Sequence, residues 1–289
     1  MTPATFLLGG DLPVHRIGYG AMRLCGQPGN FGPFADWAAG EKLLRRAVEL
    51  GVNFFDTAEA YGPGSNEEII ASALHPYAAG LVITTKGGVT KTSPTAIFPD
   101  GRPENLRRAC EASLRRLRME RIDLCQLHRP DPKVPYADSV GTLAALRAEG
   151  KIRHVGLSNV SVAQLEEALA IVPIVSVQNR YNLRERGGDD VLACCERHGI
   201  AFLPYGPLGA QPFERIAPLG SAESPLAATA ARLAATPAQI ALAWLLRRSP
   251  NIIVIPGTTV ISHLEENVAS SHLELSDADF VSLAALKTE

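Results

Sequence analysis

In Gly51-Val52-Asn53-Phe54-Phe55-Asp56, a glycine suited to end a helix is followed by a short, largely apolar run and then by an acid. A polar residue at the end of such a run occurs twice more: Lys86 follows the run 81–85, and His128 follows the run 122–127. Polar side chains at the exits of successive buried strands are typical of the face of a (β/α)8 barrel on which active sites are built. Tyr61, shortly after Asp56, belongs to the same group.

The rest of the chain repeats this alternation. Eight short apolar runs predict strands at 17–20, 52–55, 81–85, 122–127, 152–157, 174–178, 200–204 and 252–255. Amphipathic stretches predict helices at 36–50, 65–74, 102–116, 137–149, 161–171, 189–198, 236–248 and 262–270, with a further C-terminal helix at 276–287. Near-continuous apolar strands indicate a sheet buried on both faces. We predict an α/β protein: a (β/α)8 TIM barrel with an N-terminal β-hairpin at 6–17 and an extra C-terminal helix, as one domain over residues 1–289.

Local motifs refine this prediction. Gly18-Tyr19-Gly20 lacks a third glycine and an immediate helix, which argues against the phosphate loop of an open, doubly wound sheet. Ser65-Asn66-Glu67-Glu68 fits a capping box at the start of the helix 65–74. Two stretches, 87–101 and 206–225, are too long for simple turns, and loops of that length are usually functional.

Composition and charge narrow the class of protein. The net charge is −2 with acids and bases dispersed, which gives no reason to expect nucleic acid or a membrane as a partner. The first ten residues lack the basic and apolar regions of a signal peptide. Five cysteines without a CxxC motif, including the pair Cys194-Cys195, favour buried reduced thiols over disulfides or a metal site. We therefore expect a cytoplasmic protein with no bound metal.

Asp56, Tyr61, Lys86 and His128 each have an ordinary structural explanation when taken singly, but together they suit one reaction. A tyrosine can protonate an oxygen atom near neutral pH if its pKa is lowered, and a neighbouring ammonium lowers it. The aspartate would hold that lysine in place, and a neutral histidine could orient a carbonyl oxygen. This set fits protonation of a carbonyl oxygen while another group delivers hydride.

Several motifs in register resemble those of the aldo-keto reductases along essentially the whole chain. They are Gly51 to Ala58 with Tyr61-Gly62, Thr85-Lys86, Leu127-His128-Arg129-Pro130, Gly156-Leu157-Ser158-Asn159, Gln178-Asn179, Tyr205 to Gly209 and Ile255-Pro256-Gly257-Thr258. The resemblance implies a (β/α)8 barrel, NADPH as hydride donor, a small-molecule carbonyl substrate, and Asp56, Tyr61, Lys86 and His128 as the catalytic residues.

The resemblance also implies cofactor contacts. Ser158, Asn159 and Gln178 match residues that bind the nicotinamide carboxamide, and Tyr205 matches the aromatic residue that stacks on the ring. Gly206, Pro207, Leu208 and Gly209 begin a loop similar to the family's pyrophosphate clamp. At the adenosine end the matching residues are Pro256, Gly257, Thr258, Thr259 and His263 for phosphate, and Glu266 and Asn267 for adenine.

Two departures from the family stand out. Gly257 and His263 occupy positions where many relatives carry a lysine and an arginine on the 2′-phosphate, so NADPH is expected first and NADH stays possible. The chain also stops soon after its last helix, which leaves substrate selection to the loops. Residues that could either wall the pocket or merely pack on the rim are Met22, Phe31, Phe34, Trp37 and Phe98.

The leading functional hypothesis is an NAD(P)H-dependent reductase of aldehydes or ketones with Tyr61 as general acid. Within it, residues 18–22 and 244–251 resemble a bacterial branch that includes pyridoxal reductases, and no basic cluster for a phosphorylated substrate is evident. The family also includes ion-channel auxiliary subunits, so a docking or redox-sensing protein with slow turnover is the alternative. Oligomeric state and stereospecificity stay open.

Overall fold

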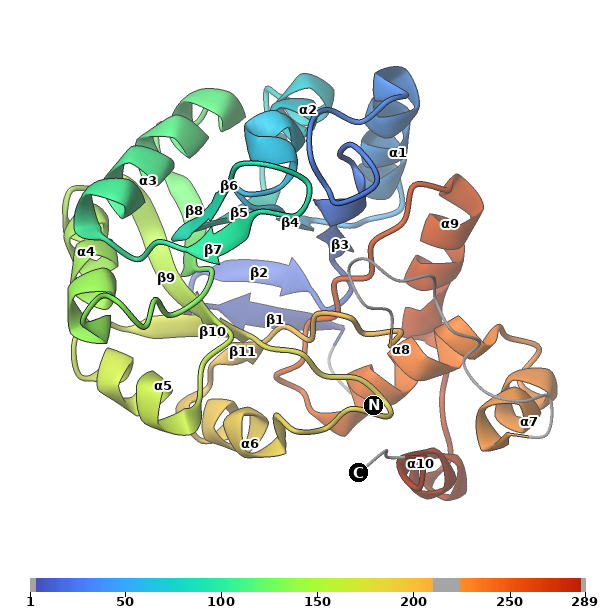
Figure 1. Ribbon diagram of the computed structural model, residues 1–289. Helices are drawn as coiled ribbons and strands as arrows, with labels where there is room; N and C mark the ends of the chain where they lie inside the picture. Colours follow the sequence, from blue (N-terminus) through green and yellow to red (C-terminus); the bar gives the residue numbers. More distant parts are fainter. Residues whose placement is uncertain (1–3, 210–223, 287–289) are drawn as a thin grey trace.

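The computed structural model describes residues 4–209 and 224–286 and contains a curled parallel sheet ringed by helices (Figure 1). The sheet has seven strands in the order β11-β10-β9-β8-β5-β4-β3. Their bounds are Tyr19–Gly20 (β3), Phe54–Asp56 (β4), Val82–Gly87 (β5), Ile122–Leu127 (β8), Ile152–Ser158 (β9), Ile174–Gln178 (β10) and Ala201–Phe202 (β11). All adjacent pairs are parallel, which places the carboxyl ends of the strands on one face.

The segment predicted as the eighth strand, 252–255, closes the barrel through isolated bridges. Ile252 bridges Phe202 on one side, and Val254 bridges Ile17 on the other. The amide of Ile253 donates to the carbonyl of Phe202 at 3.0 Å, and the amide of Gly18 donates to the carbonyl of Val254 at 2.8 Å. The predicted (β/α)8 barrel is therefore confirmed, although the segment 252–255 forms isolated bridges where a regular strand was expected.

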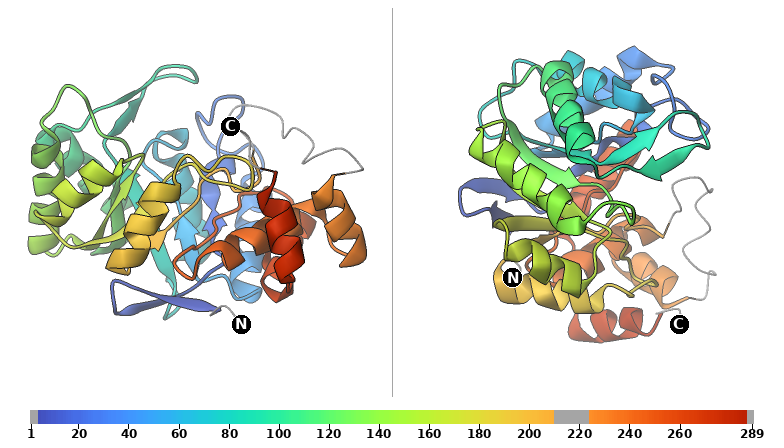
Figure 2. Two further views of the ribbon diagram at one scale, coloured as in Figure 1. Left: turned by 90° about the horizontal axis from the view of Figure 1, so that it is seen from below. Right: turned by 60° about the vertical axis from the view of Figure 1, so that its left-hand side comes forward.

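The helices lie on the outside of the barrel (Figures 1 and 2). They are α1 (Trp37–Glu49), α2 (Ser65–Leu74), α3 (Pro103–Leu117), α4 (Tyr136–Ala148), α5 (Val162–Leu169), α6 (Asp189–His198), α7 (Pro225–Arg232), α8 (Pro237–Arg248), α9 (Ile261–Ala269) and α10 (Asp277–Ala284). Three short 3₁₀ turns, η1 (Ala21–Arg23), η2 (Gly62–Gly64) and η3 (Ser270–His272), complete the helical elements. Helix starts follow the local chemistry: Thr236 and Gln239 form a reciprocal capping box at α8. Among the described residues, no helix is long and apolar enough to cross a membrane.

The N-terminal hairpin fills one end of the barrel. Strands β1 (Thr5–Leu8) and β2 (Leu12–His15) are antiparallel, as predicted for this stretch. Figure 1 shows them crossing the middle of the barrel, and Figure 2 shows them at one end of it. Leu8, Leu12 and Val14 pack with inward-facing strand residues such as Phe54 and Leu124. This apolar plug leaves the other end of the barrel for a site.

The structure departs from the sequence prediction in three places. The loop 87–101 contains a hairpin of β6 (Val89–Lys91) and β7 (Ile97–Pro99). Helix α7 was not predicted, and residues 210–223 of the predicted long loop lie outside the described part of the chain. The capping box at Ser65 is wrong: Gly64 caps α2, and the Ser65 hydroxyl donates to the carbonyls of Gly32 and Gly62.

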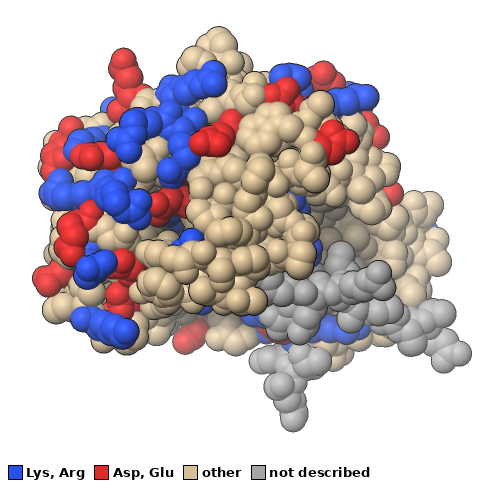
Figure 3. Space-filling model, turned by 45° about the horizontal axis from the view of Figure 1, so that its top comes forward, with Lys and Arg blue, Asp and Glu red and all other residues tan. Residues whose placement is uncertain are grey.

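The charges on the surface are mixed. On the face drawn in Figure 3, lysine and arginine side chains lie among aspartate and glutamate side chains toward one side, and the remainder is largely uncharged. This agrees with the dispersed charges of the sequence.

Candidate active site

Asp56 and Lys86 form a buried ion pair at the ends of β4 and β5. Their Oδ2 and Nζ atoms are 2.6 Å apart, and Nζ also donates to the carbonyl of Thr57 at 2.9 Å. The other carboxylate oxygen of Asp56 accepts from the side-chain amides of Gln178 at 2.9 Å and Gln126 at 3.3 Å. Burial disfavours the Lys86 ammonium, but the adjacent carboxylate outweighs it and raises the pKa of Lys86. The lysine is therefore a fixed positive charge.

Tyr61 lies just beyond this pair, in the turn that leads from β4 into α2. Its hydroxyl is 3.5 Å from the Nζ atom of Lys86, and Nζ is 5.1 Å from the ring centroid. Burial raises the pKa of Tyr61, and the neighbouring ammonium only partly offsets this rise. The expectation of a lowered pKa for Tyr61 is therefore wrong. Tyr61 keeps its proton, and the ammonium is placed to favour the phenolate once that proton leaves.

His128 follows β8 and faces Tyr61. The two ring centroids are 5.8 Å apart at an interplanar angle of 86°. Burial and the nearby charges of Lys86 and Arg129 lower the pKa of His128 well below its ordinary value. The imidazole is thus neutral near pH 7, as the sequence analysis required. Its Nδ1 atom is buried without a hydrogen-bond partner among the described residues.

Four residues expected at the nicotinamide lie next to one another at the ends of β9, β10 and the strand that follows. The Tyr205 hydroxyl donates to the side-chain oxygen of Asn159 at 2.7 Å. The side-chain amide of Asn159 donates to the carbonyl of His128 at 3.1 Å and to the Ser158 hydroxyl at 3.0 Å. Gln178 is linked to Asp56. These bonds join the candidate cofactor residues to the candidate catalytic residues.

The candidate phosphate residues lie near the start of α9. The Thr258 hydroxyl accepts from the amide of Val260 at 3.1 Å, and the Tyr19 hydroxyl donates to the carbonyl of Thr258 at 2.6 Å. A Cβ atom on Gly257 would lie 2.6 Å from the carbonyl oxygen of Gly20 and 3.9 Å from Cγ of Arg23. A lysine at position 257 therefore has no room here, whereas the side chain of Arg23 lies next to this position and lines the cavity.

A cavity of about 600 Å³ joins these groups. Of the predicted residues, it is lined by Asp56, Tyr61, His128, Ser158, Asn159, Gln178, Tyr205, Gly206, Pro207, Leu208, Pro256, Gly257, Thr258, Thr259 and His263. Lys86 is buried behind it, and three predicted cofactor residues, Gly209, Glu266 and Asn267, are not part of the lining. The structure therefore gathers the catalytic candidates and most of the cofactor candidates in one place.

The cavity also contains residues that were not singled out as candidates, although all except Ala60 lie in the predicted specificity loops 20–36, 87–101 and 129–135 or in the predicted adenosine-binding stretch 255–267. They are Gly20, Arg23, Gln27, Pro28, Gly29, Asn30, Ala60, Lys91, Ile97, Arg129, Ile255 and Val260. Of the five candidate wall residues only Met22 lines the cavity; Phe34 and Trp37 pack in a core cluster, and Phe98 is 46% exposed. The lining includes three Lys or Arg side chains, and that no basic cluster serves a phosphorylated substrate stays a prediction. Gln126, which donates to Asp56, could have been found from the sequence, because it is one of two polar residues in the strand 122–127.

The chain matches the Aldo/keto reductase family over residues 16–288 and belongs to that family. It is 45% identical over 274 residues to an uncharacterized oxidoreductase of Schizosaccharomyces pombe, covering 95% of this chain and 87% of the relative. It is 41% identical to the pyridoxine 4-dehydrogenase of Escherichia coli over the full length of both chains. Among solved structures, an aldo-keto reductase from Klebsiella pneumoniae in complex with NADPH is 28% identical with a TM-score of 0.81, over 99% of this chain and 95% of that one.

Proposed function

We propose that this aldo-keto reductase reduces an aldehyde or ketone to the alcohol with NADPH, and that Tyr61 is the general acid. One observation carries the proposal: a protonated phenol, a buried ammonium–carboxylate pair and a neutral imidazole converge at one end of a single cavity. No one of these groups suffices alone, but together they supply both a proton and the means to stabilise the charge that its loss leaves.

The proton step follows from the contacts. Tyr61 donates its proton to the substrate oxygen while hydride reaches the carbonyl carbon. Lys86, 3.5 Å from the hydroxyl, stabilises the phenolate that forms, and Asp56 holds the ammonium in position. Neutral His128 donates a hydrogen bond that orients the oxygen. A positioned acid of this kind contributes about 10²–10⁴-fold to the rate.

The charges around the cavity fit a polyanionic dinucleotide. Arg23, Lys91 and Arg129 line the cavity, whereas its one carboxylate among the described residues is Asp56, which already pairs with Lys86. When bound, NADPH supplies the hydride. Ser158, Asn159, Gln178 and Tyr205 would hold its nicotinamide, and the residues that would hold its phosphates are Gly206, Pro207, Leu208, Arg23, Thr258, Thr259 and His263, with Pro256 and Gly257 shaping that end.

Three further residues belong to the proposal although they do not line the cavity. Gly209 continues the loop from Tyr205, and Glu266 and Asn267 lie in α9 behind the phosphate end, where they would meet the adenine. NADPH is favoured over NADH because Arg23 offers a permanent charge where Gly257 offers none. The Klebsiella pneumoniae structure with NADPH bound supports this choice. NADH stays the second candidate.

Pyridoxal is the substrate we propose within this class. The support is the full-length similarity to a pyridoxine 4-dehydrogenase, since reduction of the 4-aldehyde is the reverse of oxidation at that carbon. The cysteines support action in the cytoplasm, because all five are buried and unpaired.

The test is steady-state oxidation of NADPH and of NADH, followed at the nicotinamide band, across pyridoxal, pyridoxal 5′-phosphate, simple aldehydes and quinones. We expect pyridoxal to give the highest kcat/KM with NADPH. High turnover of another aldehyde with none of pyridoxal would overturn the substrate assignment and leave the reductase intact. Negligible turnover of every carbonyl compound, with NADPH bound tightly, would overturn the reductase itself and favour the sensor.

A further inference from the structure

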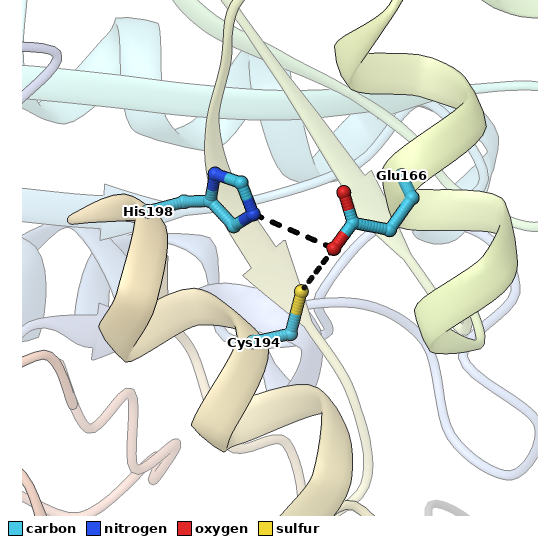
Figure 4. A group of neighbouring side chains, drawn as sticks. All are labelled: Glu166, Cys194 and His198. Carbon is cyan, nitrogen blue, oxygen red and sulfur yellow. Dashed lines mark hydrogen bonds and ion pairs between the residues drawn. The ribbon is translucent and has the colours of Figure 1, made fainter.

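Glu166, Cys194 and His198 form a compact group on the outer wall of the barrel. Cys194 and His198 are one turn apart on α6 and therefore share a face, and Glu166 on the neighbouring helix α5 points toward that face (Figure 4). Among residues 4–209 and 224–286, this is the one group of three His, Cys, Asp or Glu ligand atoms within 4.8 Å of one another.

The distances in this group fit a tetrahedral metal. The Glu166 Oε1 atom is 3.3 Å from Sγ of Cys194 and 3.4 Å from Nε2 of His198. A zinc ion with bonds of about 2.0–2.3 Å to sulfur, nitrogen and oxygen separates its ligand atoms by about 3.3–3.7 Å. The two distances from the glutamate oxygen match that spacing, and all three ligand atoms lie within 4.8 Å of one another.

The chemistry and exposure of the three ligands also suit zinc. Thiolate, imidazole and carboxylate are the three donor types that proteins use for zinc. Cys194 is buried at the base, while the Glu166 and His198 side chains are 47% and 39% exposed, so an ion can enter from solvent. Arg197, 3.8 Å from the same glutamate oxygen, opposes a cation there, and its long side chain can turn into solvent.

The group is separate from the cavity. Helix α6 ends at His198, and the chain then enters the amino end of β11, whereas the cavity lies beyond the carboxyl ends of the strands. None of the three residues lines the cavity.

We propose that Glu166, Cys194 and His198 bind one zinc-class divalent ion that ties α5 to α6, with the fourth position open to water. Binding forms the metal–sulfur bond as the thiol releases its proton to solvent, and no oxidation occurs. The proposal adds a ligand role for Cys194 to the sequence-based expectation of buried reduced thiols.

The test uses the full chain, treated with a chelator and titrated with Co²⁺ and then Zn²⁺. We expect about one Co²⁺ per chain with tetrahedral visible bands and a sulfur-to-cobalt charge-transfer band, both abolished by Zn²⁺. Cys194→Ser should remove the charge-transfer band, and Glu166→Gln and His198→Gln should weaken Co²⁺ binding at least about tenfold, because loss of a residue that merely orients a ligand already costs 10–100-fold.

Two neighbouring residues provide matched controls. Glu167→Gln changes an equally exposed acid on the same helix, and Cys195→Ser changes the adjacent thiol; both variants should keep the cobalt spectrum and affinity. No thiolate band in the wild type, or equal weakening by Glu166→Gln and Glu167→Gln, would overturn the proposal. The glutamate pair decides the matter even if a cysteine variant fails to fold, because both glutamates are exposed.

Discussion

The two ends of the cavity are built differently. At the end nearest β4 and β5, Lys86 contacts Asp56, Thr57 and Tyr61, and the carboxylate accepts two further bonds. At the other end, the described part of the chain offers no hydrogen bond or ion pair to the Arg23 guanidinium or to the His263 imidazole. The first end is fixed by bonds between its own charged groups, whereas at the second, open end the Arg23 and His263 side chains are available to a ligand.

Substitutions at the two ends of the cavity should therefore have different effects. A substitution at the fixed end breaks a buried network, so both rate and stability should suffer. A substitution at the open end should alter cofactor affinity and leave the chemistry intact.

Lys86→Met should give the largest effect. It removes the charge that stabilises the Tyr61 phenolate and leaves the Asp56 carboxylate buried without its partner. We expect the free energy of unfolding to fall by about 3–5 kcal/mol and reduction to be lost. Urea unfolding and steady-state kinetics measure the two effects.

The double variant Lys86→Met/Asp56→Asn is the control for that result. It removes both charges, so it should recover part of the lost stability but none of the activity. A single variant as stable as the wild type would show that the pair does not fix this end of the cavity.

Gly257→Ala should have the next largest effect. The added Cβ would lie 2.6 Å from the carbonyl oxygen of Gly20, so the backbone must move at a cost of about 1–3 kcal/mol in stability, with weaker NADPH binding. Gly141→Ala in α4 is the matched control, because nothing lies within 4 Å of its Cβ position. Equal unfolding midpoints for the two variants would contradict the steric account of position 257.

His263→Arg should strengthen NADPH binding at the open end of the cavity. A charge-assisted hydrogen bond to the 2′-phosphate contributes about 1.5–3 kcal/mol, so the Kd for NADPH should fall about tenfold. NADH lacks this phosphate and serves as the internal control, and its Kd should not change. Equilibrium titration of nicotinamide fluorescence measures both. A parallel gain for NADH would mean that the new arginine binds elsewhere.

The smallest expected effect is that of pH on kcat/KM. Burial lowers the pKa of His128 well below its ordinary value and raises that of Tyr61, so both shifts lead away from neutral pH. We therefore expect neither group to change its charge between pH 6 and 9. With saturating NADPH, kcat/KM for the aldehyde should be level over this range; a step near pH 6.5 would assign a charge change to His128 that the structure does not support.

The strand-end residues were predictable because parallel strands in a barrel bring their carboxyl ends together. Asp56, Lys86 and His128 could thus be assembled from three separate motifs, and the hairpin plug followed from its short apolar strands. That residues 1–289 form one domain stays a prediction.

The other features of the site depend on distances that no sequence motif encodes. Arg23 at the end of η1, Asn30, and Lys91 at the end of β6 reach the cavity from segments whose paths the sequence pattern does not fix. The pKa of Tyr61 is set by the balance between burial and the Lys86 charge, and the sequence revealed the charge but not the degree of burial. The steric clash of a side chain at position 257 was likewise not predictable, because it depends on where the Gly20 carbonyl lies.

Single-turnover reduction by Tyr61→Phe, measured with pre-bound NADPH, tests the assignment of Tyr61 as the proton donor. The variant removes one oxygen atom and leaves the Lys86–Asp56 pair in place. We predict that the rate falls by about 10²–10⁴-fold while the Kd for NADPH stays close to that of the wild type. Retention of most of the wild-type rate, or a loss of NADPH affinity as large as the loss of rate, would contradict the assignment of Tyr61 as the proton donor.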